Sequence, residues 1–242
     1  MIKFFRKIRY NLVEKNKTGK YFKYAIGEII LVVMGILIAF QINNWNEQRK
    51  ESSLELEMLK GLSNDLTNNR VKIKSMILGD SSIIAGNQHL LTLLKDKNSI
   101  FSDSLQFSFG NINRYYGFFP QGMAYESLKS KGFHTVRNKS LRTSIIELYD
   151  ETYFANSHIN DLKSQIYISS NAILNKRLFT TKDINRKVPN NYNELKNDSE
   201  FINTLSHITA ENINFQEYAK TMLKKTISVK MEIDSEIKKL NN

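Results

Sequence analysis

The fold is decided first by twelve consecutive apolar residues, IILVVMGILIAF, which occupy positions 29–40. Extended to residues 24–42, the apolar segment is interrupted only by Glu28 and Gln41. At a helical rise of 1.5 Å per residue the extended segment is about 28 Å long, close to the roughly 30 Å thickness of a bilayer's hydrocarbon core. We therefore predict a transmembrane helix over residues 24–42.

The basic residues of the chain are concentrated before this segment. Residues 1–23 hold eight Lys or Arg and one acid, whereas the other residues hold 27 bases and 23 acids. A nucleic-acid-binding domain would spread its basic surface over the folded part, so we expect no nucleic-acid partner. A short basic tail beside an apolar segment indicates the cytoplasmic side of a membrane, so residues 43–242 are predicted to be exported.

Aromatic and apolar residues flank the predicted span on both sides. The N-terminal ones recur at helical spacing among Lys and Arg, so the tail is either a basic amphipathic helix lying on an anionic leaflet or a plain positive flank. Both interpretations stay open, and either makes the bilayer the first partner. The residues predicted to lie at the membrane interface are Phe4, Phe5, Ile8, Tyr21, Tyr24 and Trp45.

Two other interpretations of the apolar segment are less consistent with its surroundings. A cleaved signal peptide needs small residues at its cleavage site, and the sequence Ala39-Phe40-Gln41 that follows has bulky ones. A core helix of a soluble domain has no need of a basic tail and aromatic flanks. An uncleaved signal anchor is the prediction that we keep.

One face of the predicted span carries polar and small residues. Glu28, Gly35, Ala39 and Ile42 follow one another at steps of seven, four and three, which places them on one side of a helix. Small residues allow close helix contact in lipid, so this stripe is a candidate packing surface for a homo-oligomer or another membrane protein. The alternative is that the Glu28 carboxylate reaches the nearby interface and has no partner role.

The sequence around the span resembles a known family. Residues 24–47, YAIGEIILVVMGILIAFQINNWNE, are similar to the signature of the domain of unknown function 6090 family, single-span proteins of flavobacteria and relatives. The resemblance is specific over residues 1–50, looser over Tyr125 to Tyr149, and elsewhere limited to length and helical character. It implies a single-pass protein of the bacterial inner membrane with a periplasmic helical domain, and it supplies no activity.

The exported part is predicted to be helical. All ten Gly lie at or before residue 132, so residues 133–242 contain one helix breaker, Pro189. An all-β or α/β domain would need turn residues much more often. Apolar residues at steps of three and four continue the span into a stalk helix, followed by a break at Gly79-Asp80 and a shorter helix through Leu94. The stalk positions are Leu59, Leu62, Leu66, Ile73 and Met76.

Two further helices of about 40 residues are expected to form an antiparallel hairpin. Asn138 and Asp198 are suitable N-caps, and a loop over residues 180–197 separates the two helices. The first carries Leu141, Ile145, Leu148, Ile159, Leu162 and Ile166 at helical spacing, and the second carries Phe201, Leu205, Ile208, Phe215, Met222, Val229, Ile233, Ile237 and Leu240. The predicted fold is all-α: one N-terminal transmembrane helix continuing into an exported antiparallel helical bundle with long helices.

Residues 99–135 are rich in Phe, Tyr and Gly. These aromatic side chains either pack together to close one end of the bundle or line a pocket for a ligand or partner. Basic side chains that follow in the sequence would hold an acidic group of such a ligand. The candidate pocket residues are Phe118, Phe119, Tyr125, His134, Arg137 and Arg142.

The chain lacks the motifs of known catalytic and metal sites. It has no Cys, its four His are isolated, and it contains no phosphate-binding loop, dinucleotide-binding motif or nucleophile elbow. We expect no enzyme activity, no metal and no cofactor. The favoured function is a protein-interaction scaffold or accessory subunit that binds an unknown membrane or periplasmic protein, and the alternative is a periplasmic sensory or ligand-binding domain that signals through a partner.

Overall fold

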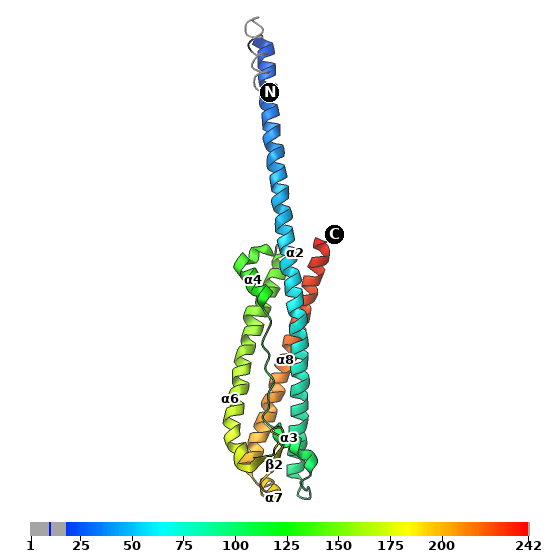
Figure 1. The fold of residues 1–242 in the computed structure, drawn as a ribbon, viewed down its shortest axis with the longest axis vertical. Helices are drawn as coiled ribbons and strands as arrows, with labels where there is room; N and C mark the ends of the chain where they lie inside the picture. The colour runs from blue at the N-terminus through cyan, green and yellow to red at the C-terminus, as the bar shows by residue number, and fades with distance from the viewer. Residues whose placement is uncertain (1–9, 11–17, 242) are drawn as a thin grey trace. The chain divides into compact units, whose positions relative to one another are not determined.

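The structure is a computed structural model that describes residue 10 and residues 18–241. The predicted all-α fold is confirmed (Figure 1). The helices are α2 (Thr18–Lys95), η1 (Asp103–Leu105), α3 (Gln106–Gly110), α4 (Met123–Lys131), η2 (Phe133–Thr135), α5 (Lys139–Ile146), the π-helix η3 (Glu147–Tyr153), α6 (Phe154–Arg177), α7 (Tyr192–Leu195) and α8 (Ser199–Leu240). The strands are β1 (Leu178–Thr180) and β2 (Lys187–Pro189).

The chain divides into two units, and the boundary falls inside α2. We call Met1–Leu54 the N-terminal unit and Glu55–Asn242 the helical unit. In the helical unit, the last part of α2, the continuous run α5–η3–α6, and α8 lie alongside one another (Figure 1). The Ser63 hydroxyl of α2 donates to Asp234 of α8 at 2.6 Å, and Lys163 of α6 reaches Asp80 of α2 at 3.0 Å.

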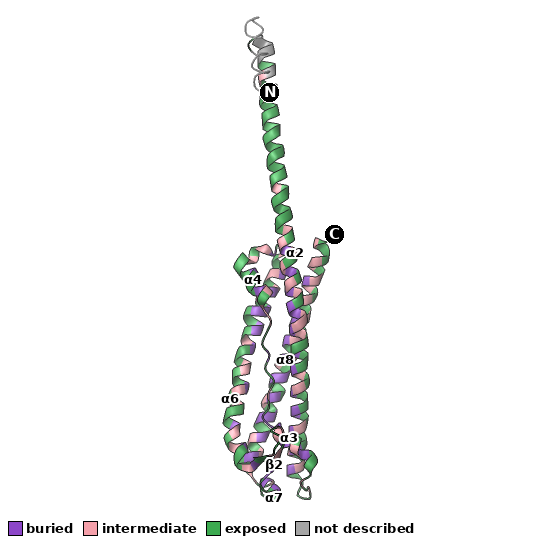
Figure 2. Cartoon of the chain, viewed as in Figure 1, coloured by how far each residue is buried: buried purple, intermediate pink, exposed green. Residues whose placement is uncertain are grey.

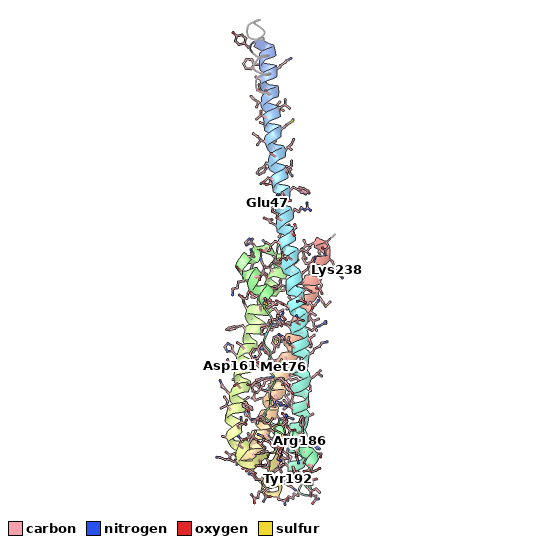
Figure 3. All side chains as sticks on the ribbon, viewed as in Figure 1. Glu47, Met76, Asp161, Arg186, Tyr192 and Lys238 are labelled. Atoms are coloured by element: carbon pink, nitrogen blue, oxygen red, sulfur yellow. The ribbon has the colours of Figure 1, made fainter. Side chains whose placement is uncertain are left out.

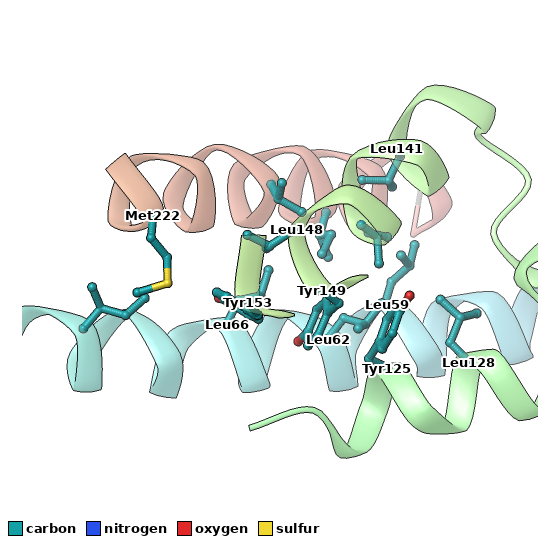
Figure 4. Close-up of a cluster of buried hydrophobic side chains, with 14 of the residues drawn as sticks. Leu59, Leu62, Leu66, Tyr125, Leu128, Leu141, Leu148, Tyr149, Tyr153 and Met222 are labelled. Atoms are coloured by element: carbon teal, nitrogen blue, oxygen red, sulfur yellow. The ribbon is translucent and has the colours of Figure 1, made fainter. Parts of the chain in front are cut away.

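Two hydrophobic cores hold the helical unit together. The first surrounds the stripe Leu59, Leu62 and Leu66 of α2 and includes aromatic residues of α4 and η3 (Figure 4). The second joins Leu90 and Leu94 of α2 to residues of α3, β1, α7 and α8. All five predicted stalk positions are buried, as predicted from their spacing. Burial on this scale is the main source of stability for such a bundle.

An extended segment, residues 111–122, runs along the helices between α3 and α4 (Figure 1). Buried backbone groups need hydrogen-bond partners, and this segment has no helix or strand to supply them. Side chains of the long helices do so instead. The bonds join Asn87 to Ile112 O, Lys163 to Tyr116 O, Asn156 and Asn160 to Phe118 O, and Asn69 to both Gln121 N and Gln121 O.

The predicted loop over residues 180–197 contains more structure than expected. β1 and β2 pair antiparallel, with Leu178 opposite Pro189 and Thr180 opposite Lys187, and the short helix α7 follows. The three-residue strands are too short to show an alternating pattern in the sequence. The predicted N-cap of the last helix is confirmed, because the Asp198 side chain accepts a hydrogen bond from Phe201 N.

The predicted break at Gly79-Asp80 is wrong, because α2 continues through it to Lys95. A Cβ atom added at Gly79 would lie 2.4 Å from the Tyr116 ring. The missing side chain therefore lets the extended segment approach the helix. Asp80 is buried and paired with Lys163, so neither residue acts here as a helix breaker.

The predicted buried face of the helix after Asn138 is confirmed at its start and wrong at Leu162, whereas Ile159 and Ile166 are partly buried. Asn138 caps α5 by accepting from Leu141 N, and Leu141, Ile145 and Leu148 are buried. The π-helix η3 then adds to the residues per turn and rotates the later positions. Leu162 is consequently 46% exposed, and the buried positions of α6 are Asn156, Lys163, Ser170 and Leu174.

In the N-terminal unit, α2 contains one stretch that is long and apolar enough to cross a membrane, and its apolar window is not buried by the protein (Figure 2). The side chains of Ile29, Leu37 and Phe40 are exposed. The predicted interface residues Phe4, Phe5 and Ile8 lie outside the described residues, as do the side chains of Tyr21 and Tyr24. Trp45 is exposed, and the Arg49 guanidinium carbon lies 6.0 Å from its ring centroid.

Candidate partner-binding groove

A groove of about 890 Å³ lies on the helical unit where α4, η3 and the start of α6 meet. We call it the tyrosine groove, because three tyrosines form much of its lining. Its size is within the range of roughly 300–1,000 Å³ that is usual for binding pockets. The lining residues are Pro120, Gly122, Met123, Tyr125, Glu126, Lys129, Tyr149, Asp150, Tyr153, Phe154 and Ser157.

The tyrosine rings form a continuous stack. Tyr125 and Tyr149 lie face to face with centroids 4.3 Å apart and planes 3° from parallel, and Tyr153 meets Tyr149 edge-on at 5.1 Å (Figure 4). Such ring pairs contribute about 0.5–1.5 kcal/mol beyond their buried area. The π-helix η3 supplies both Tyr149 and Tyr153, and π-helical turns occur often at functional sites.

Small residues and one carboxylate position the walls of the groove. A Cβ atom added at Gly61 of α2 would lie 3.1 Å from Ala124 of α4, so this glycine permits the close approach of the two helices. The Asp65 carboxylate accepts a hydrogen bond from Ala124 N at 2.9 Å. This bond satisfies a backbone donor in the first turn of α4, where the helix itself supplies no acceptor.

Burial further favours the protonated form of the three tyrosines. It raises the pKa of Tyr125 and of Tyr149 far above the ordinary value of 10, and that of Tyr153 to about 12. The nearby Asp150 carboxylate adds to the increase at Tyr125. The Tyr153 hydroxyl shares a 3.0 Å hydrogen bond with Thr226, whereas the Tyr149 hydroxyl has no hydrogen-bond partner among the described residues. These phenols are therefore hydrogen-bonding groups and not bases at neutral pH.

The rim of the groove is apolar and acidic. Met123 and Phe154 are 77% and 62% exposed. Glu126 and Asp150 are exposed acids on the rim, and Lys129 is its one basic lining residue. An exposed apolar rim around a preformed hollow is typical of an interaction surface.

The structure separates the six pocket residues proposed from the sequence. Tyr125 lines the tyrosine groove. Phe118 is buried in the first core against Tyr153, and Phe119 is exposed beside it, where the two line smaller neighbouring hollows. His134, Arg137 and Arg142 do not line the tyrosine groove. Arg137 pairs with the buried Glu55 at 3.0 Å, and Arg142 donates to Val136 O at 3.4 Å.

Sequence reasoning missed Tyr149, Tyr153 and Asp150 as lining residues. Tyr149 and Tyr153 are four residues apart, a spacing that puts two side chains on one helical face. That signal was present in the sequence. Their stacking on Tyr125 depends on how α4 packs across η3, which no local pattern encodes.

A buried ion pair lies deeper in the helical unit. The Lys163 ammonium is 3.0 Å from Asp80 and donates to Tyr116 O at 3.0 Å, and both side chains are almost fully buried. Burial raises the pKa of Asp80, and the charge of Lys163 opposes that increase. The pair fixes the extended segment to α2 and α6, so we assign it a structural role.

The proposed packing stripe of the span lies in the N-terminal unit. Glu28 is partly exposed, and Gly35, Ala39 and Ile42 are exposed within that unit. A Cβ atom added at Gly35 would meet nothing within 4 Å. The surface over this glycine is therefore uncovered by the described residues.

The described residues contain no group of three or more His, Asp or Glu side chains placed to hold a metal ion. The fold and the groove together define a class: a helical protein whose described residues include one helix apolar enough to span a membrane and a surface groove lined by tyrosines. The chain belongs to the family of unknown function DUF6090, whose model matches residues 28–213. The family model thus matches far beyond residues 1–50, where the resemblance in sequence is most specific. No curated protein and no solved structure matches the chain.

Proposed function

We propose that this protein is a single-pass protein of the bacterial inner membrane whose helical unit lies in the periplasm and binds another protein. The observation that carries the proposal is the tyrosine groove with its exposed apolar rim. The basic tail and the apolar helix favour a cytoplasmic N-terminus. In this role the protein is a scaffold or accessory subunit and not an enzyme.

The chemistry of the groove favours one kind of partner segment. Its floor is aromatic, and its exposed acids Glu126 and Asp150 outnumber its single base, Lys129. The neighbouring Glu147 and Glu151 of η3 are also exposed. An apolar segment flanked by Lys or Arg would complement this surface, because charge complementarity steers encounter and selects partners.

Site-specific photocrosslinking in cells tests the proposal. A photoreactive amino acid replaces Met123 at the groove rim, and in a matched control it replaces Met231 of α8, which is also exposed but lies outside the groove. We expect one protein to crosslink at position 123 and not at position 231. The charge-reversed variant Glu126→Lys/Asp150→Lys should lose at least nine-tenths of that crosslink.

Two results would contradict the protein-binding proposal. Equal crosslinking at both positions would indicate nonspecific contact. Absence of any protein crosslink at position 123 would shift the assignment to the sensory alternative, in which a small molecule occupies the helical unit.

Cysteine labelling tests the proposed topology, because the chain has no native Cys. Asn46→Cys should react with a membrane-impermeant maleimide in cells with a permeable outer membrane. Asn11→Cys should react only after lysis. Labelling of position 11 in intact cells would reverse the proposed orientation.

The stripe of Glu28, Gly35, Ala39 and Ile42 stays a proposed packing surface within the membrane. Gly35→Leu should reduce self-association or partner capture, because it fills the space that a second helix needs. Ile36→Leu, a conservative change at a neighbouring position, is the control and should leave self-association unchanged. If Gly35→Leu crosslinks to itself and to partners as much as wild type does, the stripe is not a packing surface.

A further inference from the structure

A separate hollow, of about 390 Å³, lies at the end of the helical unit that contains the β-hairpin. Arg186 and Tyr192, labelled in Figure 3, mark this end. We call it the hairpin hollow; it shares no lining residue with the tyrosine groove. Its walls include Arg114 and Tyr115 of the extended segment, Tyr167, Asn171 and Asn175 of α6, and Lys187 of β2.

The three segments are held together by close contacts. A Cβ atom added at Gly110 would lie 2.0 Å from Asn185 O, so only glycine allows this approach. The Asn113 amide nitrogen donates to Ser170 and Asn171, both at 3.1 Å. Arg114 donates to the Asn185 side chain at 2.6 Å. The hollow is therefore a built feature of the fold and not a gap between loose loops.

The charge of the hollow has one sign. Arg114 and Lys187 line it, no carboxylate does, and neither cation forms an ion pair among the described residues. Lys187 is half-buried, with its ammonium 3.4 Å from the Asn175 side-chain oxygen. Burial lowers the pKa of Lys187, and a bound anion would offset that effect.

Polar donors and an aromatic wall surround the two cations. The side-chain amide nitrogens of Asn171 and Asn175 make no hydrogen bond to the described residues and remain available to a ligand. Tyr115 and Tyr167 meet edge-on with centroids 5.9 Å apart, which presents both ring surface and hydroxyls. Amide and phenol groups beside a ring surface suit a ligand with several hydroxyls on a carbon frame.

We infer that the hairpin hollow binds a small acidic sugar, a polyhydroxylated ring with one carboxylate or phosphate. Arg114 and Lys187 would bind the anionic group, and Asn171, Asn175 and the tyrosines would bind the hydroxyls and the ring. A carboxylate or a phosphate could pair with the same two cations, so the proposed ligand includes both kinds of acidic sugar. The inference is independent of the protein-binding role proposed for the tyrosine groove.

Calorimetric titration of the full-length protein in detergent tests this assignment. The probes are glucuronate, glucose 6-phosphate, glucose and inorganic phosphate. We expect one or both acidic sugars to bind at least tenfold more tightly than glucose and inorganic phosphate, and the better of the two identifies the anionic group. Equal binding of all four probes, binding of inorganic phosphate alone, or binding of none would overturn the assignment.

Matched variants locate the binding. Lys187→Gln and Arg114→Gln should each weaken binding of the acidic sugar at least tenfold. Lys182→Gln removes an exposed cation from the same hairpin that does not line the hollow, and it should leave the affinity unchanged. Circular dichroism confirms that each variant is folded. Unchanged affinity in a folded Lys187→Gln variant would also overturn the assignment.

Discussion

Helix α2 contains two apolar regions with opposite environments. In the N-terminal unit, residues 29–40 are apolar on every side and their large side chains are exposed. In the helical unit, Leu59, Leu62 and Leu66 form one stripe of an otherwise polar helix and are fully buried. A helix that is apolar all round needs an apolar solvent, whereas a striped helix needs neighbouring helices. The period of the pattern thus indicates which surroundings each region requires.

Ionisable groups extend this comparison. The N-terminal unit has Glu28 next to the apolar run, in a partly exposed position. The helical unit has Asp80, which is almost fully buried and paired with Lys163. Inside a protein core, a charge persists only with a counter-charge and hydrogen bonds.

Breaking the Asp80–Lys163 ion pair should cause the greatest loss of folding stability. Lys163→Met leaves the Asp80 carboxylate without its counter-charge and Tyr116 O without its donor, so the free energy of unfolding of the helical unit should fall by about 3–5 kcal/mol. Urea unfolding in detergent, followed by near-ultraviolet circular dichroism of the tyrosines, measures this change. Glu28→Gln is the control in the other region and should leave the transition in place.

The double variant Asp80→Leu/Lys163→Met sharpens the first test. Replacing both charges with apolar groups removes the desolvation cost, so a large part of the lost stability should return. A double variant as unstable as Lys163→Met alone would show that the charge is not the cause.

The next effect compares the two apolar regions directly. Leu62→Ala creates a cavity in the first core, and the same urea measurement should show a loss of about 2–5 kcal/mol. Leu37→Ala removes the same atoms from an exposed side chain of the apolar run and should leave unfolding of the helical unit unchanged. Equal losses in the two variants would mean that residues 29–40 pack within the protein and do not face lipid.

A smaller loss of stability is expected at Gly110, where the backbone of the hairpin approaches closely. Gly110→Ala forces a methyl group against Asn185 O and should cost about 1–3 kcal/mol, the usual cost of overpacking. Gly86→Ala is the control, because its added Cβ atom would meet Ser108 at an ordinary 3.6 Å. Thermal unfolding of both variants should separate them, and similar melting temperatures would contradict the close contact.

The smallest predicted effect depends on pH. The hydrogen bond from Arg177 lowers the pKa of Asp198 below its ordinary 3.8, and the cap bond from Phe201 N adds to this. A lowered folded-state pKa stabilises the protein above pH 3.8, and this contribution is lost as pH falls through the folded pKa. Asp198→Asn keeps a capping oxygen but removes the charge, so it should cost about 1 kcal/mol at pH 7, and this cost should shrink as the pH falls below 3.8.

Unfolding of wild type and Asp198→Asn at pH 7 and at low pH checks this difference. Asp198→Ala removes the cap as well and should remain destabilised at low pH. A wild-type advantage over Asp198→Asn that does not shrink at all between pH 7 and low pH would show that charge is not its source.

Local signals predicted the start of each long helix in the helical unit. Asn138 and Asp198 are caps because their short polar side chains accept bonds from the first helical turn, which requires no distant residue. The buried positions of α8 were equally predictable, because its period stays regular from Phe201 to Ile233. Where the period changes, at η3, the prediction for Leu162 failed.

The site was harder to predict than the fold. Of the six candidate pocket residues, Tyr125 is the one that lines the tyrosine groove. The tyrosine that it stacks on, Tyr149, comes from η3, which the sequence did not point to. Arg137 and His134 follow in the sequence but lie outside the groove, and Arg137 pairs instead with Glu55 of α2. Residues that directly follow α4 in the sequence do not line the groove, because α4 ends at Lys131 and the chain then leaves it.

Four features could be predicted from the linear pattern alone: the all-α class, the apolar helix of the N-terminal unit, the two helix caps and the stripe of α2. These features depend on composition, period and short-range hydrogen bonds, which a linear pattern contains. Three other features arise from packing: the continuation of α2 past Gly79, the attachment of an extended segment by Asn side chains, and the formation of the tyrosine groove and the hairpin hollow. Those features depend on contacts between residues far apart in the chain, such as Asp80 with Lys163 and Gly110 with Asn185, whose geometry is set by packing.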